Sequence, residues 1–433
     1  MSGDHSSDSS DKALNRRLFL SGVASGAVGG GALVWGANRL MNNRMAQAPI
    51  GAQRKGGLGL PGPYPGRVVE VHHPGAASKY ERNREAVKAM VDRGMKELVG
   101  TDDGVEAWKS MFSKGDRVGI KVVPVGRPHS ISSPEVVLEI IDSLIKAGVR
   151  AKDILVFDRY EQEFRICKYD KILPDGVHWE CESVDYDEQQ LDIDGQLAGL
   201  PRSKRSSGYD RDEFRELAFC APSHDRQDDR RFRSHLSKII SQKIDKYIGV
   251  PVLKDHRSAG VTLSLKNLSH GSVNNVCRSH ISNWHLGKQR FEHGMALNQC
   301  GTFIPAIVSL PKIREKAVLQ VLDGLVATYE GGPGVWNSSF ATWNHNSLFF
   351  ATDPVALDHI GWEIIDKKRA EKGWAPVAKM GLEGVHRIDV KNGLRMPSEQ
   401  FQMRQPEHIP LAATLGLGTF ERHLINHQRV EIV

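Results

Sequence analysis

Residues 116–159 read DRVGIKVVPVGRPHSISSPEVVLEIIDSLIKAGVRAKDILVFDR and indicate the fold class. The first part, 116–124, and the last, 153–159, are short apolar runs rich in β-branched residues, as in buried strands. Between them, residues 132–148 have the spacing of a helix: Ser133 can cap it, Pro134 suits its first turn, and Gly148 lies just past its end. Two strands joined through a helix by short loops predict parallel strands covered by helices.

The same alternation continues on both sides of this stretch. We expect a strand at 67–73, a helix at 81–98, strands at 244–254, 261–268, 316–327 and 346–354, and a helix at 353–373. Residues of about 185–235 are charged and poor in apolar runs, which indicates an insertion. The prediction is an α/β domain over 67–373, with a mostly parallel sheet flanked by helices and an irregular charged insertion, followed by a C-terminal extension at 374–433.

The N-terminal region carries a targeting pattern. Arg16 and Arg17, followed by Phe19 and Leu20, resemble a twin-arginine export signal, and the weakly hydrophobic stretch 18–37 suits such a signal. The AQA at 46–48 offers a cleavage site, and a Gly/Pro-rich linker follows at 49–66. We expect a signal peptide at 1–48, transport by the twin-arginine translocon, a periplasmic location and no permanent membrane span after cleavage. A retained N-terminal anchor is the alternative.

Composition removes several classes of function. The five cysteines include no C-x-x-C pair, so neither a ferredoxin-type iron–sulfur motif nor a zinc ribbon is encoded, although a bridge such as Cys277 with Cys300 stays open. The net charge is +6, and the densest basic run, 225–235, is diluted by aspartates, so we expect no nucleic-acid partner. Serine-hydrolase, P-loop and zinc-protease motifs do not occur in the sequence.

Charged side chains recur at the ends of the expected strands, where open α/β sheets bind ligands. Lys121 and Arg127 follow the strand at 116–124. The middle of the chain adds the largest group, which comprises Lys254, His256, Lys266, Asn267 and His280. Asp323, Asp353 and Asp358 follow later, and Asp353 also suits the cap of the helix that begins with Pro354.

This order resembles the family called domain of unknown function 362. Its pattern is an early strand with Lys, a K-x-H…T-x-x-x-K-N core, a later His, an Asp-Gly strand and a D-P-V-A-L-D helix. The matching positions, spread over about residues 67–370, are Lys121; Lys254, His256, Thr262, Lys266 and Asn267; His280; Asp323 and Gly324; and Asp353 to Asp358. Some relatives append a ferredoxin-like cysteine module, which this chain lacks.

A more distant resemblance is to the nickel-pincer lactate racemases, which share a His…Lys…His order. That resemblance implies that Lys266 anchors a covalent cofactor, that His280 ligates nickel and that His256 acts as acid or base. The residues beside Lys266 depart from the racemase pattern, because Ser264-Leu265 precedes it and Asn267-Leu268 follows it. The cofactor is thus unknown from the sequence, with a transition metal, nickel or iron, held by His280 and His256 as one hypothesis.

Charge alone leads to a simpler interpretation. Lys121, Lys254 and Lys266 in one crevice would bind a carboxylate or phosphate, and neighbouring ammonium groups lower each other's pKa, so that a neutral amine can act as base or nucleophile. We assign catalytic roles to Lys266, His256 and Lys121, and substrate binding to Lys254, Asn267, Arg127 and Asp323. Asp353 and Asp358 are assigned structural or orienting roles.

The expected function is a metal- or cofactor-dependent enzyme, isomerase-like, racemase-like or an oxidoreductase, acting on a small anionic substrate. The alternative is a non-catalytic periplasmic protein that binds an anion or a metal in the same crevice. A structural partner of an exported redox complex is a third hypothesis.

Overall fold

The chain divides into two units, residues 1–52 and 53–433, and the computed structural model describes parts of the second: residues 57–185, 193–194, 203–216, 233–276, 279, 300–378 and 406–433. Arg16, Arg17 and His280 lie outside the described residues. Within the described ranges, no helix has both the length and the apolar character needed to cross a bilayer.

The elements alternate between strands and helices along the chain. The strands are β1 (Arg67–His72), β2 (Ala77–Ser78), β3 (Glu81–Arg82), β4 (Val118–Lys121), β5 (Ile154–Tyr160), β6 (His178–Ser183), β7 (Tyr209–Glu216), β8 (Arg233–Ser237), β9 (Lys246–Gly249), β10 (Val252–His256), β11 (Gly260–Val261), β12 (Ala317–Glu330), β13 (Ala341–Trp343), β14 (Ser347–Ala351) and β15 (Asn426–Glu431). The α-helices are α2 (Arg84–Val99), α3 (Gly104–Lys109), α4 (Pro134–Lys146), α5 (Glu161–Ile166), α6 (Tyr169–Ile172), α7 (Leu263–His270), α10 (Cys300–Val308), α11 (Pro311–Lys316), α12 (Pro354–Glu371) and α14 (His408–Thr414). Short η turns lie at Ala151–Asp153, Ile239–Lys243 and Arg422–Leu424.

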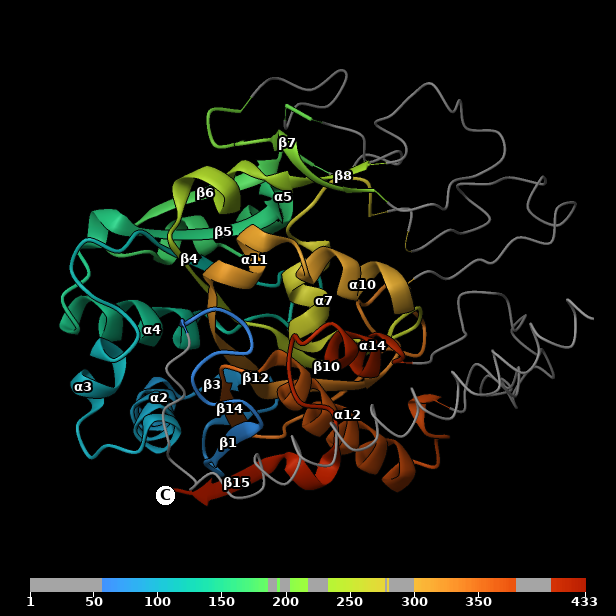
Figure 1. Ribbon diagram of the computed structural model, residues 1–433. Coiled ribbons are helices and arrows are strands. Elements are labelled where there is room, and N and C mark those ends of the chain that lie inside the picture. Colours follow the sequence, from blue (N-terminus) through green and yellow to red (C-terminus); the bar gives the residue numbers. More distant parts are fainter. Residues whose placement is uncertain are drawn as a thin grey trace, which may run out of the picture. The chain divides into compact units, whose positions relative to one another are not determined.

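One large mixed sheet organises this unit, in the order β15-β1-β14-β12-β9-β4-β5-β6 (Figure 1). All neighbours on this path are parallel except β14, which runs antiparallel to both β1 and β12. The predicted α/β class with a mostly parallel, helix-flanked sheet is therefore confirmed.

Both faces of the sheet are buried. Successive residues of β12 point into different cores: Val321 packs with the side chains of α2, α3 and α4, whereas Leu322 packs with those of α7, α10 and α12. This alternation is what a period of two residues requires of a strand covered on both sides. It explains why β12 reads as an almost unbroken apolar run.

Local signals place the helices that cover the sheet. Asn83 caps α2 by accepting from the backbone N–H groups of Glu85 and Ala86. Pro134 begins α4, and Gly148, with φ 103°, follows it, as the sequence predicts. The hydroxyl of Ser133 makes no capping bond; the first turn of α4 is instead held by a bond from Ser133 N–H to the carboxylate of Asp323.

The prediction of a strand at 261–268 is wrong. Only Gly260–Val261 are extended, as β11, and Leu263–His270 form α7. The alternating apolar and polar residues of TLSLKNL imitate a strand because the helix is buried on all sides from Leu263 to Ser269, so its polar positions do not mark a solvent face. This correction changes the site, because it places Lys266 and Asn267 on a central helix.

Other boundaries differ less. The predicted strand at 244–254 is two strands, β9 and β10, separated at Pro251, which has no N–H for a sheet ladder. In the charged insertion, β7 and β8 form an antiparallel pair. The expected C-terminal extension contributes the edge strand β15, which pairs in parallel with β1.

Candidate functional site

The carboxyl ends of the parallel strands carry buried polar side chains. Lys121 ends β4 and Asp158 lies near the end of β5, and Lys121 Nζ donates to Asp158 Oδ1 at 3.2 Å and to Asn267 Oδ1, on α7, at 2.8 Å. Lys121 is 3% exposed. Gly271 leaves room for the amine of Lys121, because a Cβ added to Gly271 would lie 2.1 Å from Lys121 Nζ. We call Lys121, Lys254 and Lys266 the lysine cluster.

Lys254, on β10, is fully buried with few partners. Its Nζ has two long contacts, each 3.4 Å, to the carbonyl oxygens of Ser130 and Pro333. Burial lowers the pKa of Lys254 to about 7; the carboxylate of Glu163 opposes this shift and the charge of Lys266 adds to it. Glu163 also pairs with Arg127, at 2.5 Å between Nη1 and Oε1, so Arg127 reaches the surroundings of Lys254 through this carboxylate.

Lys266, on α7, is 7% exposed, and its amine makes no hydrogen bond to the described residues. Burial lowers its pKa to about 8; the thiol of Cys300 opposes the shift, and the charge of Lys121 adds to it. Lys266 thus interacts electrostatically with both other lysines, and a shared site for the three stays a prediction. A buried amine near its neutral form is chemically unlike a surface lysine.

Helix α7 is fixed at its N-terminus by a side chain of α12. Asp358 Oδ1 accepts from Ser264 N at 2.7 Å and Oδ2 accepts from Leu265 N at 2.9 Å. These N–H groups have no partner within the helix, so the carboxylate acts as a cap supplied from another element. It sets the position of Lys266 and Asn267 one to three residues later.

Asp353 caps the N-terminus of α12 in a similar way. Its Oδ1 accepts from Val355 N and Ala356 N, and its Oδ2 accepts from Gly66 N and Thr419 N, all between 2.8 and 3.0 Å. The carboxylate thus joins the beginning of α12 to two loops far away in the sequence. Asp353 is the helix cap that the sequence indicates.

Two amide side chains near the lysine cluster have unpaired atoms. Asn267 Nδ2 and both amide atoms of Gln320 are buried without hydrogen-bond partners among the described residues. Both side chains approach the backbone at Gly249: a Cβ added to this glycine would lie 2.2 Å from Gln320 Oε1 and 3.2 Å from Asn267 Nδ2. Buried polar atoms are nearly always paired, so these atoms indicate a place that a ligand or water completes.

Two predicted site residues are engaged with backbone groups. His256 Nδ1 accepts from Ser258 N at 3.0 Å and Ala259 N at 3.2 Å, which shapes the turn between β10 and β11. Asp323 accepts from Ser133 N at 2.7 Å and Leu325 N at 2.9 Å. The catalytic and binding roles assigned to these two side chains stay predictions.

Among the described residues, no three His, Cys, Asp or Glu side chains are arranged to hold an ion, and the metal hypothesis stays a prediction. A neutral imidazole whose Nδ1 accepts hydrogen bonds carries its proton on Nε2, so His256 as placed does not offer a free nitrogen to a metal. Cys167 and Cys181 carry free thiols. His280, the other proposed ligand, lies outside the described residues.

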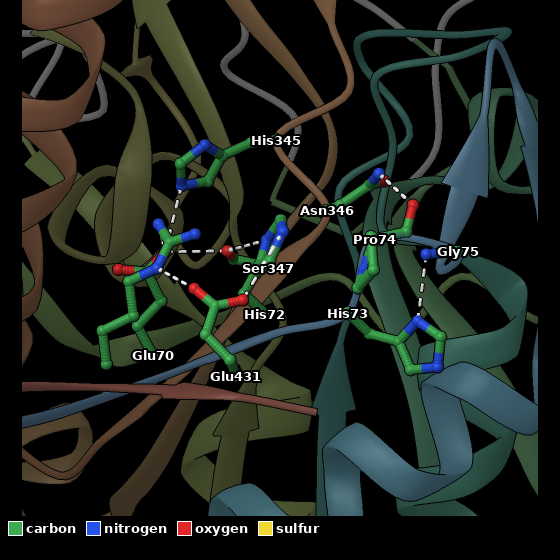
Figure 2. Close-up of polar contacts among 10 residues, drawn as sticks. Glu70, His72, His73, Pro74, Gly75, His345, Asn346, Ser347 and Glu431 are labelled. Atoms are coloured by element: carbon green, nitrogen blue, oxygen red, sulfur yellow. Dashed lines mark hydrogen bonds and ion pairs between the residues drawn. The ribbon is translucent and has the colours of Figure 1, made fainter. Parts of the chain in front are cut away.

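A second polar cluster lies at the opposite end of the sheet, around Glu70 of β1 (Figure 2). Its carboxylate accepts from Ser347 Oγ at 2.7 Å and lies 2.9 Å from Arg429 Nη1, 2.9 Å from His427 Nε2 and 3.3 Å from His345 Nε2. Burial alone would raise the pKa of Glu70, but the hydrogen bonds from these neighbours outweigh it and hold the pKa well below its usual range. The cluster fastens β15 to β1.

Sequence reasoning missed several polar residues of the lysine cluster region. Asp158 had a usable signal, since it follows an apolar strand as Lys121 does. Gln320 lies inside the apolar run of β12 and carried no signal. Nor did His408, which is fully buried at the start of α14 and is close enough to Lys266 for their charges to interact.

Fold and site together define an α/β protein with a buried lysine cluster at the carboxyl ends of parallel strands. Residues 221–363 match the family described as domain of unknown function (DUF362). The resemblance inferred from the sequence is confirmed over a range shorter than 67–370, which includes Lys254 and Lys266 and leaves Lys121 outside.

Comparison with solved structures finds a protein from Thermotoga maritima. It is 11% identical, with a TM-score of 0.36, and the match covers 68% of this chain and 60% of that one. This chain therefore spans less than two thirds of that protein's length. No curated protein matches the sequence.

Proposed function

We propose that this protein is an enzyme that binds a small anionic molecule at the lysine cluster and uses a lysine amine as base or nucleophile on it. The single observation that carries the proposal is Lys266 on α7, a side chain only 7% exposed whose amine makes no hydrogen bond to the described residues. An isomerisation or racemisation beside a carboxylate fits this chemistry.

The donors around Lys266 outnumber the acceptors. Lys121 uses Asp158 and the oxygen of Asn267, whereas Lys254 has only two carbonyl contacts of 3.4 Å and Asn267 Nδ2 has no described partner. An oxygen-rich anion would supply the missing acceptors and balance the positive charge, whereas a cation would add repulsion. This supports an anionic ligand over a metal ion as the occupant.

The low pKa values support catalysis in addition to binding. With pKa values of about 7 for Lys254 and about 8 for Lys266, both lowered by burial, a useful fraction of each amine is neutral near pH 7.5. Groups with pKa values close to the working pH are the effective general bases, and a neutral amine is also a nucleophile.

The experiment is proton exchange followed by NMR in D₂O, with a panel of small 2-hydroxy and 2-oxo carboxylates, alongside calorimetric binding of the same compounds. We expect at least one compound to bind and to exchange the hydrogen next to its carboxylate. Lys266→Met should abolish exchange and keep binding. The matched control is Lys316→Met, because Lys316 is also partly buried but donates to three backbone carbonyls, of Ile240, Ser241 and Ile244.

The second candidate is a non-catalytic protein that captures an anion, which the excess of donors also favours. It predicts binding without exchange in the wild type and a loss of binding in Lys266→Met. If no member of the panel binds and Lys266→Met changes nothing, the anion site is refuted.

We also propose that the twin-arginine translocon exports the protein to the periplasm. The support is the sequence around Arg16 and Arg17, which lies outside the described residues. Replacing both arginines by lysine should keep the protein in the cytoplasm, as measured by cell fractionation. Unchanged export of that variant would refute the proposal.

A further inference from the structure

We infer that Lys266 is a nucleophile that forms an imine with the carbonyl group of a small 2-oxo acid, and that His408 moves the protons for this step. The inference rests on the anion site proposed above and names its substrate class. It draws on a buried pair, an amine on α7 and an imidazole on α14, that has no other evident purpose.

His408 is the first residue of α14 and is fully buried. Neither ring nitrogen has a hydrogen-bond partner among the described residues. Burial, and after it the charge of Lys266, lowers the pKa of His408 to about 3, so the ring is neutral at physiological pH. An imidazole whose two nitrogens are both buried and unpaired is costly, which points to a functional use.

Helix α10 brings these two groups together, because it packs against both α7 and α14. A Cβ on Gly301 would lie 3.1 Å from Glu407 Oε2, so the start of α10 abuts the residue just before His408. Cys300, one residue earlier, influences the pKa of Lys266 from the same end of α10. Lys266 and His408 therefore lie in the interior where these three helices meet.

The nitrogen groups of the site can be assigned to the two ends of a 2-oxo acid, the carboxylate and the carbonyl. The carboxylate would accept from Lys254 Nζ and Asn267 Nδ2, which have weak or no described partners. The carbonyl carbon would then be presented to Lys266. A carboxylate without a neighbouring carbonyl would use only the first half of this arrangement.

The reaction is a condensation without oxidation or reduction. The nitrogen lone pair of Lys266 forms a bond to the carbonyl carbon, the π electrons of the carbonyl move to its oxygen, and one N–H proton passes from nitrogen to that oxygen. The carbon–oxygen bond of this carbinolamine then breaks, the second N–H proton passes from nitrogen to the departing oxygen, and one water leaves. His408 takes the proton from nitrogen and returns it to the departing oxygen, as a general base and then a general acid.

The test uses pyruvate as the probe, with sodium borohydride to reduce any imine to a stable amine. Intact-mass spectrometry should show one reduced pyruvate unit per chain, and peptide mapping should place it on Lys266. Acetone, which lacks the carboxylate, should be trapped far less. Propionate, which lacks the carbonyl, should bind by calorimetry and slow the trapping of pyruvate. Lys266→Met should lose the adduct and Lys316→Met should keep it.

The outcomes separate this inference from the proposed function. If propionate and pyruvate bind but borohydride traps nothing, or traps a residue other than Lys266, the imine is overturned and the anion site stands. If neither compound binds and nothing is trapped, both fail. Mapping in the wild-type protein decides the case even if Lys266→Met does not fold.

The role of His408 has its own test. In His408→Phe, the trapping rate should fall by roughly 100-fold, which is the usual size of a lost acid–base group, and its dependence on pH should stay that of the Lys266 amine. Calorimetric binding of propionate should be unchanged. A parallel loss of propionate binding and of trapping would show that His408 has only a packing role.

Discussion

Gly271→Ala tests whether the backbone after α7 sets the position of Lys121. The added Cβ would lie 2.1 Å from both Cε and Nζ of Lys121, whereas ordinary contact begins at 3.4 Å, so the amine must retreat by about 1.3 Å. Lys121 is 3% exposed and cannot turn to solvent. A movement of that size breaks its 2.8 Å bond to Asn267 or its 3.2 Å bond to Asp158.

The cost has two parts. A hydrogen bond that involves a charged group contributes about 1.5–3 kcal/mol, and forcing a methyl group into a packed interior costs about 1–3 kcal/mol. Because the side chain can relax in part, we expect the free energy of unfolding to fall by about 2–4 kcal/mol. Gly57→Ala is the control: nothing lies within 4 Å of its added Cβ, so stability should change by less than about 0.5 kcal/mol.

The assay is urea unfolding followed by tryptophan fluorescence, with Gly271→Ala made in the wild type and in Lys121→Ala. If the clash acts through Lys121, the loss of unfolding free energy caused by Gly271→Ala should fall to about 1 kcal/mol or less in Lys121→Ala, since the effects of substitutions at contacting residues are not additive. The reasoning is refuted if the cost is the same in both backgrounds, or if it is negligible in the wild type.

Three further substitutions test the polar interior. Burial raises the pKa of Glu182 to about 8, whereas the carboxyl of the unfolded chain ionises at about pH 4.3. The stability that protonated Glu182 contributes in acid is therefore lost as the pH rises from about 4.3 to about 8. Thermal melts should therefore show Glu182→Gln more stable than the wild type by about 2–4 kcal/mol at pH 8 and equal to it at pH 4; an equal difference at both would contradict this. Glu70 has a lowered pKa, so its contribution is present above about pH 4.3 and is lost as pH falls toward the folded value. Glu70→Gln should cost about 3 kcal/mol at pH 7 and progressively less in acid, and a cost independent of pH would count against the ionised form. Asp353→Ala, which frees four backbone N–H groups, should lower the free energy of unfolding in urea by about 3 kcal/mol, clearly more than the exposed cap substitution Asp103→Ala does; equal costs would disprove the cross-linking role.

The sequence predicts the parallel part of the sheet well because each element there carries its own local signals. Residues 116–159 contain a strand, a capped helix and a second strand, and the structure has β4, α4 and β5 in those places. The error at 261–268 has a physical cause: α7 is short and buried on every side, and its N-terminus is capped by Asp358, about ninety residues later. A local pattern cannot report a cap that comes from another helix.

In the candidate site, too, some features could be predicted from the sequence and others could not. Lys121 and Lys254 could be predicted to converge because strand ends in α/β sheets meet at one edge, whereas Lys266 and Asn267 lie on helix α7 and not on the strand that the sequence indicated. The pairing of Lys121 with Asn267, and the neighbourhood of Lys266 and His408, depend on how α7, α10 and α14 pack. Such contacts between helices leave no trace in the spacing of residues.

The position of β1 has a consequence for how the molecule is made. This strand lies between β14 and β15, and the partners of its central Glu70, Ser347 and His427, are 277 and 357 residues further along the chain. During translation, β1 emerges early and must wait, with both of its hydrogen-bonding edges open, until those distant segments appear. Folding of this end of the sheet is thus governed by late, long-range encounters, which are slow and leave the nascent chain dependent on protection from aggregation.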